Sequence, residues 1–168
     1  MVDFSAETDA NLRRYVQGFQ NLTDVERVAI QEFSILWQVF EGRRAETNFG
    51  TNKALAMNWC TGNQASLIEI TKKSYEYYQF RYALADDHAR KLKDLIGQER
   101  NVKVRTHIDD GLLAEAADKQ KLIALILICY RLRNNTFHGV KATYNYEGQL
   151  DNFTHAIKFL NAVLSQQG

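Results

Sequence analysis

The sequence predicts an all-α protein, a helical bundle with a long excursion between its early and late helices. The chain has 168 residues and no proline, whereas average usage would give roughly eight. Proline interrupts helix interiors, so its absence favours long helices. Apolar residues also recur at spacings of three and four in several segments, as in helices with one buried face. The length suits a single domain over residues 1–168.

The strongest helix signal begins at Thr23. Thr23 and Glu26 form a capping-box pattern, which marks a helix N-terminus. The apolar residues that follow have helical spacing: Val25, Val28, Ala29, Phe33, Leu36, Trp37 and Phe40. Gly42 ends this periodicity, and Arg43 and Arg44 after it suit a helix C-terminus. A shorter helix is expected before it, around residues 12–19.

The middle of the chain gives mixed signals. Residues 45–64 hold two glycines and several Asn and Thr residues, which predicts a long connection with room for one short helix. Residues 65–84 have helical spacing, although their many tyrosines are also at home in strands. Residues 45–110 together form the predicted excursion.

Two further segments precede the apolar centre of the sequence. Residues 86–98 predict a helix with Asp86 as its N-cap and Gly97 as its stop. Residues 99–110, "ERNVKVRTHIDD", alternate enough to predict a short strand or an ordered loop.

The most apolar stretch runs without interruption from Leu122 to Cys129. Eight apolar residues fit a buried strand as well as a buried helix. The flanks are rich in helix formers, which favours a helix over residues 115–134. A last helix is predicted within residues 148–164, with one apolar stripe.

Composition limits the class of protein. A net charge of +1 excludes a generally basic, DNA-coating surface, so contact with nucleic acid needs a local patch. Cys60 and Cys129 lack metal-type spacing and predict free, buried thiols. No secretory signal pattern and no membrane-length apolar run are visible, so we expect a cytoplasmic protein.

The apolar run is followed at once by "RLRNNTFHG", residues 131–139. On a helical wheel Arg133 falls on the inward stripe, eleven residues from Leu122 and thus within about 20° of it. Arg131 falls on the opposite side. An arginine on a core-facing stripe needs a partner, a wet cleft or another subunit.

His138 would point away from Arg133 if the helix continued unbroken. Asn134 and Asn135 are poor helix formers and Gly139 is a natural stop, so we expect the helix to loosen here. Both side chains can then reach one cleft. The plainer interpretation is a capping histidine and a salt-bridged arginine.

This stretch resembles the Arg-x4–6-His signature of the HEPN family of RNases. Arg133, Asn134 and His138 match the motif's arginine, the polar residue after it and its histidine. Arg131 also satisfies the spacing, but Leu132 follows it, so we prefer Arg133. The "RNNxFHG" wording is typical of several bacterial HEPN groups linked to defence and toxin–antitoxin systems.

The resemblance implies a metal-independent endoribonuclease without cofactors. A histidine takes the proton of a 2′-hydroxyl, and an arginine clamps the phosphate as charge builds. His138 and Arg133 would be the catalytic residues, with Asn134 in support. The resemblance also implies a homodimer with the two motifs facing each other, and it allows an antitoxin protein as a further partner.

Other residues complete the hypothesis. Arg131, Lys141 and Tyr144 are candidates for RNA binding beside the motif. His88 and His107 are expected to be solvated, and His155 to lie on the surface or to support the motif from a neighbouring helix. The alternatives are a non-catalytic HEPN module that binds RNA, a nucleotide or a partner protein, and a purely structural helical dimer.

Overall fold

The computed structural model describes residues 5–16, 18–44, 64–97, 102–137 and 148–165, and every regular element within these ranges is helical. The predicted all-α class is therefore confirmed for this part of the chain. The helices are α1 (Ala6–Tyr15), η1 (Phe19–Asn21), α2 (Asp24–Arg44), α4 (Gln64–Gln79), η3 (Phe80–Leu84), α5 (His88–Ile96), α6 (Val102–Gly111), α7 (Asp118–Phe137) and α8 (Leu150–Ser165). None of these helices is both long and apolar enough to cross a membrane.

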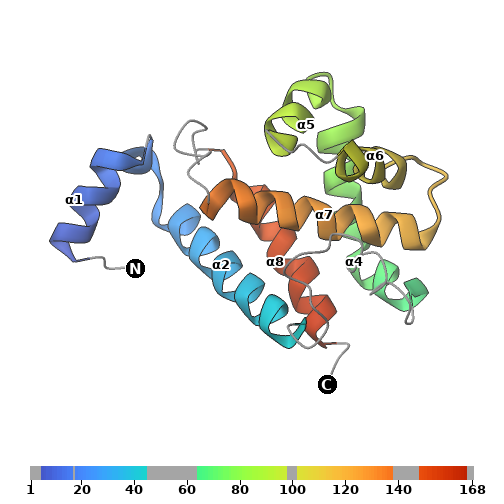
Figure 1. Cartoon of the computed structure of the whole chain (residues 1–168), viewed down its shortest axis with the longest axis horizontal. Helices are drawn as coiled ribbons and strands as arrows, with labels where there is room; N and C mark the ends of the chain where they lie inside the picture. The colour runs from blue at the N-terminus through green and yellow to red at the C-terminus, as the bar shows by residue number, and fades with distance from the viewer. Residues whose placement is uncertain (1–4, 17, 45–63, 98–101, 138–147, 166–168) are drawn as a thin grey trace.

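α7 is the central helix of the bundle. Figure 1 shows it crossing the middle of the molecule, with α5 and α6 along one side and α2 and α8 on the other. It packs against α4, α5, α6 and α8, and the Tyr130 ring also reaches Trp37 of α2, 6.4 Å between centroids. Every residue from Leu122 to Cys129 is buried. The uninterrupted apolar run therefore belongs to a helix that is covered on all sides.

Several helix boundaries agree with the sequence. The backbone N–H of Thr23 donates to Glu26 Oε2 at 2.9 Å, and the N–H of Glu26 donates to Thr23 Oγ1 at 3.3 Å, so the capping box is confirmed. Gly97 follows α5 with φ of +54°, a left-handed conformation that suits glycine. The predicted stop at Gly97 is confirmed as well.

α2 continues through Gly42 and ends at Arg44, so the predicted C-terminus is confirmed. Other boundaries differ. The N-cap position of α5 is Asp87 rather than Asp86. The first helix covers Ala6–Tyr15, earlier than the expected residues 12–19. The connection predicted over residues 45–64 lies outside the described residues, except that Gln64 begins α4.

α6 corrects the prediction for residues 99–110. A helix, not a strand or loop, covers Val102–Gly111. Val104 and Ile108, one helical turn apart, are both buried, and α6 packs along α7. Packing on a neighbouring helix thus overrides the strand preference of β-branched residues, which is weak and depends on context.

The tyrosines of α4 and η3 have a structural role against α8. The Tyr78 hydroxyl donates to the Asn152 carbonyl at 2.7 Å, and those of Tyr77 and Tyr82 both donate to Asn152 Oδ1 at 3.2 Å. Burial raises the pKa of Tyr78 well above its ordinary value, so its hydroxyl stays protonated. These hydrogen bonds explain how so many tyrosines fit a helix instead of a strand.

Candidate functional site

The motif singled out in the sequence occupies the last two turns of α7. The helix runs unbroken to Phe137, so the loosening expected at Asn134 and Asn135 is wrong up to that residue. His138, Lys141 and Tyr144 lie outside the described residues. The described part of the site is therefore the helical segment that begins at Arg131.

Arg131 lies in the interior, with 7% of its surface exposed. Its Nη2 donates to the Ile96 carbonyl at 2.7 Å and to Asn135 Oδ1 at 3.3 Å, and its Nε lies 3.4 Å from the Leu95 carbonyl. The last carbonyls of a helix lack intrahelical donors and carry partial negative charge. Arg131 therefore supplies both hydrogen bonds and positive charge to the C-terminus of α5.

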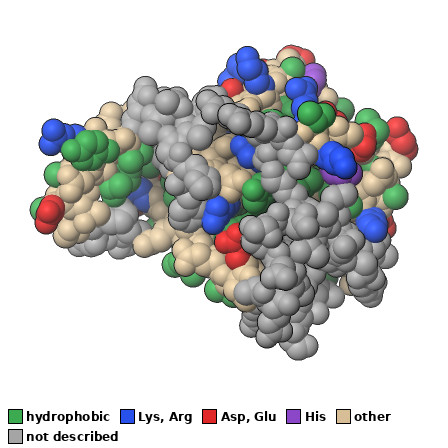
Figure 2. Space-filling view, viewed as in Figure 1, with side chains coloured by type: hydrophobic (Ala, Val, Ile, Leu, Met, Phe, Trp, Pro, Cys, Tyr) green, Lys and Arg blue, Asp and Glu red, His purple; other side chains and the backbone are tan. Residues whose placement is uncertain are grey.

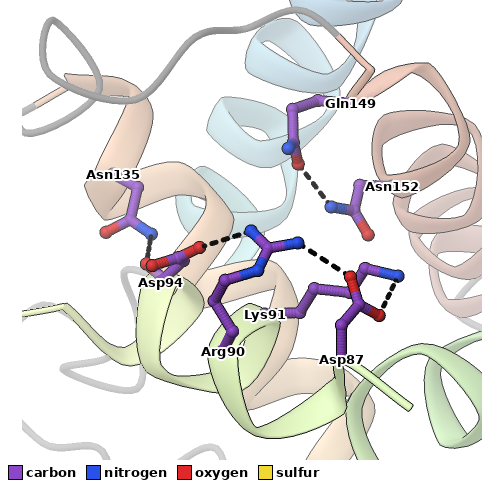
Figure 3. A network of polar contacts seen from close by, with 7 residues as sticks. All are labelled: Asp87, Arg90, Lys91, Asp94, Asn135, Gln149 and Asn152. Atoms are coloured by element: carbon purple, nitrogen blue, oxygen red, sulfur yellow. Dashed lines mark hydrogen bonds and ion pairs between the residues drawn. The ribbon is translucent and has the colours of Figure 1, made fainter. Parts of the chain in front are cut away.

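Asn135 completes this cap. Its Nδ2 donates to the Leu95 carbonyl at 2.9 Å and approaches the Asp94 carbonyl at 3.5 Å, and the residue is only 2% exposed. Figure 3 shows Asn135 reaching from α7 toward Asp94, beside the ion pairs along α5. Asn135 thus holds α7 and α5 together. Its poor helix propensity predicted a loosened helix and gave no sign of this contact.

These contacts correct the wheel argument for Arg131. It does lie on a different side of α7 from Arg133, since its partners are on α5 and those of Arg133 on α2. The side of Arg131, however, is not an outer face, because α5 covers it. A buried guanidinium bound to carbonyl oxygens has no surface for RNA, which argues against the RNA-binding role predicted for Arg131.

Arg133 is the more accessible of the two arginines, with 27% of its side chain exposed. Its Nη1 donates to Asn134 Oδ1 at 3.1 Å. Its Nη2 lies 3.6 Å from Oε2 of Glu41 on α2, whose side chain is 33% exposed. A guanidinium at this depth can still be reached by a ligand from solvent. Asn134 and Glu41 orient it from two sides.

Glu41 is the residue that the sequence did not reveal. It lies in the last turn of α2, between the buried Phe40 and Gly42, and nothing in its local pattern distinguishes it from a solvated acid. Only the packing of α2 beside the end of α7 brings its carboxylate to Arg133.

His155 does not lie on a free surface. Its contacts within the described chain are with α4 and not with the motif. Its ring stacks on Tyr77 at 4.2 Å between centroids and 6° between planes, and its Nδ1 lies 3.4 Å from Ser74 Oγ. Burial is the main cause that lowers the pKa of His155, so the ring tends to stay neutral. The expected surface role is wrong, and the geometry favours packing between α4 and α8.

His88 and His107 are both half-buried, so neither is as freely solvated as expected. His88 Nδ1 lies 2.7 Å from the Ala85 carbonyl, which favours a proton on that nitrogen. His88 also lines a small cavity of about 260 Å³ between η3, α5 and α6, with Arg105 and Asp109 at the same opening. This cavity carries no residue of the sequence motif.

Free thiols were predicted for both cysteines. Cys129 is free and fully buried in α7, as predicted, and burial strongly raises its pKa. Cys60 lies outside the described residues. Within the described chain, no three His, Cys, Asp or Glu side chains gather in a way that could hold a metal ion.

Comparison with protein-family models, with curated proteins and with solved structures found no match to this chain.

Proposed function

We propose that this protein is a metal-independent endoribonuclease of HEPN type, with Arg133 and His138 as its catalytic pair. The observation that carries the proposal is the position of the motif. "RNNTFHG" begins in the last turns of the buried central helix of an all-helical protein, and its arginine is the accessible one. A role in toxin–antitoxin or phage-defence systems, with an antitoxin as partner, belongs to the same proposal.

The chemistry needs two groups. A base removes the proton of the 2′-hydroxyl, whose oxygen attacks the adjacent phosphorus, while the 5′-oxygen of the next nucleotide leaves. His138 suits the first role because the ordinary pKa of histidine lies near neutrality. Arg133 suits the second because a planar guanidinium can bind two phosphate oxygens as negative charge accumulates.

Asn134 and Glu41 define the resting state of Arg133. Asn134 accepts from Nη1, and Glu41 pairs with Nη2, so the guanidinium is held in one orientation before any RNA arrives. Pre-orientation lowers the entropy that is lost on binding. A phosphate that approaches Nη2 must compete with the Glu41 carboxylate, and that exchange is favourable only where the phosphate makes further contacts.

Pairing of two chains belongs to the proposal as well. HEPN-type dimers bring two motifs face to face, so the partner chain would supply those further phosphate contacts. A two-fold pair is the simplest closed assembly.

The test is cleavage of a mixed RNA by the purified protein. We expect native RNA to yield 2′,3′-cyclic phosphate ends, and an RNA with a single 2′-deoxy residue at the cut site to resist cleavage there. Activity should survive excess EDTA. Loss of activity on chelation, restored by magnesium or manganese, would contradict the mechanism.

A matched pair of histidine variants controls the test. His138→Ala should lose about 10²–10⁴-fold in rate, the usual contribution of a positioned general base. His107→Ala, on α6, should keep full activity. A folded His138→Ala protein with full activity would remove His138 from the chemistry. An inactive, folded wild type that still binds RNA would favour the alternative, a non-catalytic HEPN module.

A further inference from the structure

The cavity between η3, α5 and α6 combines an apolar lining with a polar rim. Tyr82 and Leu112 line it and are exposed by only 3% and 2%. Arg105 and Asp109 of α6 and His88 of α5 are its polar residues. Figure 2 shows basic, acidic and histidine side chains beside hydrophobic ones over α5 and α6. Pockets for drug-sized ligands measure about 300–1,000 Å³, so a volume of about 260 Å³ suits a smaller molecule.

An irregular helical turn forms one wall of this cavity. η3 is a π-helix, in which the N–H of Ala85 donates to the Phe80 carbonyl, five residues back, at 2.8 Å. Such turns are rare and often lie at functional sites. Tyr82 and Ala83 of this turn line the cavity, and the Tyr82 hydroxyl is held by Asn152. The wall is therefore fixed in one conformation by its own hydrogen bonds.

Arg105 and Asp109 present two opposite charges side by side at the rim. They are four residues apart on α6, a spacing that makes side chains neighbours on a helix. Arg105 Nε lies 3.5 Å from Asp109 Oδ2, and the two side chains are 62% and 45% exposed. Within the described chain neither side chain has another hydrogen-bond or ion-pair partner. The two Nη groups and the second carboxylate oxygen are thus open to a ligand.

His88 adds a hydrogen-bond acceptor to the rim. Its Nδ1 lies 2.7 Å from the Ala85 carbonyl. A proton on that nitrogen of the neutral ring leaves Nε2 as an acceptor. No side chain or backbone group of the described chain donates to Nε2. The rim therefore holds a cation, an anion and a neutral acceptor, each with unused bonding capacity.

These groups identify the class of ligand that fits. A carboxylate suits the Nη groups of Arg105, because a planar guanidinium can bind two oxygens at once. An ammonium group next to that carboxylate suits the free oxygen of Asp109 and can also donate to His88 Nε2. An apolar side chain on the same carbon suits the lining of the cavity. A free α-amino acid carries all three parts within a small molecule.

We propose that this cavity binds a free α-amino acid with an apolar side chain. Arg105 binds its carboxylate, Asp109 and His88 bind its ammonium group, and its side chain contacts Tyr82 and Leu112. No residue of the sequence motif lines the cavity, so this site does not depend on the proposed RNase function. In the absence of an amino acid, RNA cleavage should therefore be the same in Arg105 variants as in the wild type.

The test is titration of the full-length protein with L-leucine, measured by calorimetry and by ¹H–¹⁵N NMR shifts. We expect saturable binding with a Kd on the order of 1 mM, as suits so small a ligand. 4-Methylpentanoate is leucine without its ammonium group, and 3-methylbutylamine is leucine without its carboxylate. Each should bind at least about fivefold more weakly, because each leaves one rim charge without its partner.

Matched variants locate the site. Arg105→Gln should weaken L-leucine binding at least about fivefold, since it removes the partner of the carboxylate. Arg90→Gln is the control, because Arg90 is 66% exposed and its ion pairs with Asp87 and Asp94 lie outside the cavity. It should bind like the wild type. Ala89→Phe places a ring in the cavity from an exposed position on α5, so it should abolish binding in a folded protein.

Each other outcome overturns the proposal. A wild type that shows no saturable binding up to about 20 mM L-leucine would show that the cavity is not an amino-acid site. Equal binding of 4-methylpentanoate would make it a simple carboxylate site. Unchanged binding in Arg105→Gln or in Ala89→Phe would place L-leucine elsewhere, and equal weakening in Arg90→Gln would show a general effect of charge. RNA cleavage by the same proteins, without amino acid, separates failure of this proposal from failure of the proposed function.

Discussion

Two arginines, two residues apart on α7, occupy opposite kinds of environment. Arg131 is buried and bound to the last carbonyls of α5, whereas Arg133 is partly exposed and paired with a carboxylate of α2. Carbonyl partners are part of the backbone and cannot leave while α5 is folded. A carboxylate partner can swing away. The first arrangement is suited to holding two helices together, and the second to exchange with an anionic ligand.

The comparison also shows that residues of one sequence motif can have different roles. Arg131 and Asn135 fix the end of α7 against α5, and Arg133 and Asn134 lie on the side that remains reachable. Within five residues, supporting and candidate catalytic side chains alternate around the helix. Arg131 therefore matches the Arg-x6-His spacing in sequence only, because its side chain has a structural role.

The largest expected effect concerns activity at Arg133. Arg133→Ala should lower the cleavage rate by about 10²–10³-fold, because it removes the donors proposed to face the phosphate in the transition state. Its free energy of unfolding should fall by less than about 1 kcal/mol, since a partly exposed ion pair contributes little. Single-turnover cleavage and urea unfolding measure the two quantities.

Arg105→Ala serves as the control for Arg133→Ala. Arg105 lies on α6 with 62% of its side chain exposed and an ion pair to Asp109 at 3.5 Å. The Arg105→Ala substitution removes the same charge and a comparable ion pair, and it leaves α7 unchanged. Equal losses of activity in both variants would mean that only overall charge matters, and would remove Arg133 from the site.

The next effect is on stability, at Arg131. Arg131→Ala should lower the free energy of unfolding by about 2–4 kcal/mol, because the Ile96 carbonyl loses this donor, the Leu95 carbonyl keeps only the Asn135 amide, and a large buried side chain is removed. At temperatures where the variant is folded, it should keep most of the wild-type activity. A stable variant without activity would reverse the two roles assigned here.

A smaller effect is expected at the glycine beside this cap. A Cβ at position 97 would meet Arg131 and Asn135 only at ordinary contact distance, so the cost of Gly97→Ala comes from φ of +54°. We expect a loss of about 1–2 kcal/mol in unfolding free energy. Gly42→Ala, inside α2 with nothing within 4 Å, should instead gain about 0.5–1 kcal/mol. The same sign at both positions would contradict this account.

Much of the fold could be predicted because local signals and packing agree. The capping box at Thr23 and the stop at Gly97 depend on hydrogen bonds and dihedral angles within a few residues. α6 was missed because its valines favour strands locally, and only burial of Val104 and Ile108 makes it a helix. α2 runs through Gly42 to its predicted end at Arg44, since one glycine costs a helix about 1 kcal/mol, which packing readily offsets.

The candidate site was predictable only in part, for a geometric reason. A helical wheel ranks the sides of one helix but cannot say which of them neighbouring helices cover. At the end of α7, α5 covers the side of Arg131, while the side of Arg133 stays partly open. The burial of Arg131 follows from where α5 ends, and the pairing of Arg133 follows from where α2 ends. Both features depend on how three helices pack together. The sequence pattern of residues 131–139 does not contain that information.

The smallest expected effect tests the partner of Arg133 directly. Glu41→Gln removes the carboxylate that competes with phosphate for Nη2 and leaves a side chain of similar size. A partly exposed pair is worth about 0.2–1 kcal/mol, so RNA should bind about 1.5- to 5-fold more tightly, with KM lowered and kcat unchanged.

Glu69→Gln, on the exposed surface of α4, removes the same charge away from this pair and measures any general electrostatic effect. The difference between the two variants is the local contribution of Glu41, and it should shrink in high salt as the ion pair is screened. A Glu41→Gln protein that binds RNA more weakly, or that has a lower kcat, would show the opposite arrangement. The carboxylate would then hold Arg133 in its working position, and RNA would bind without displacing it.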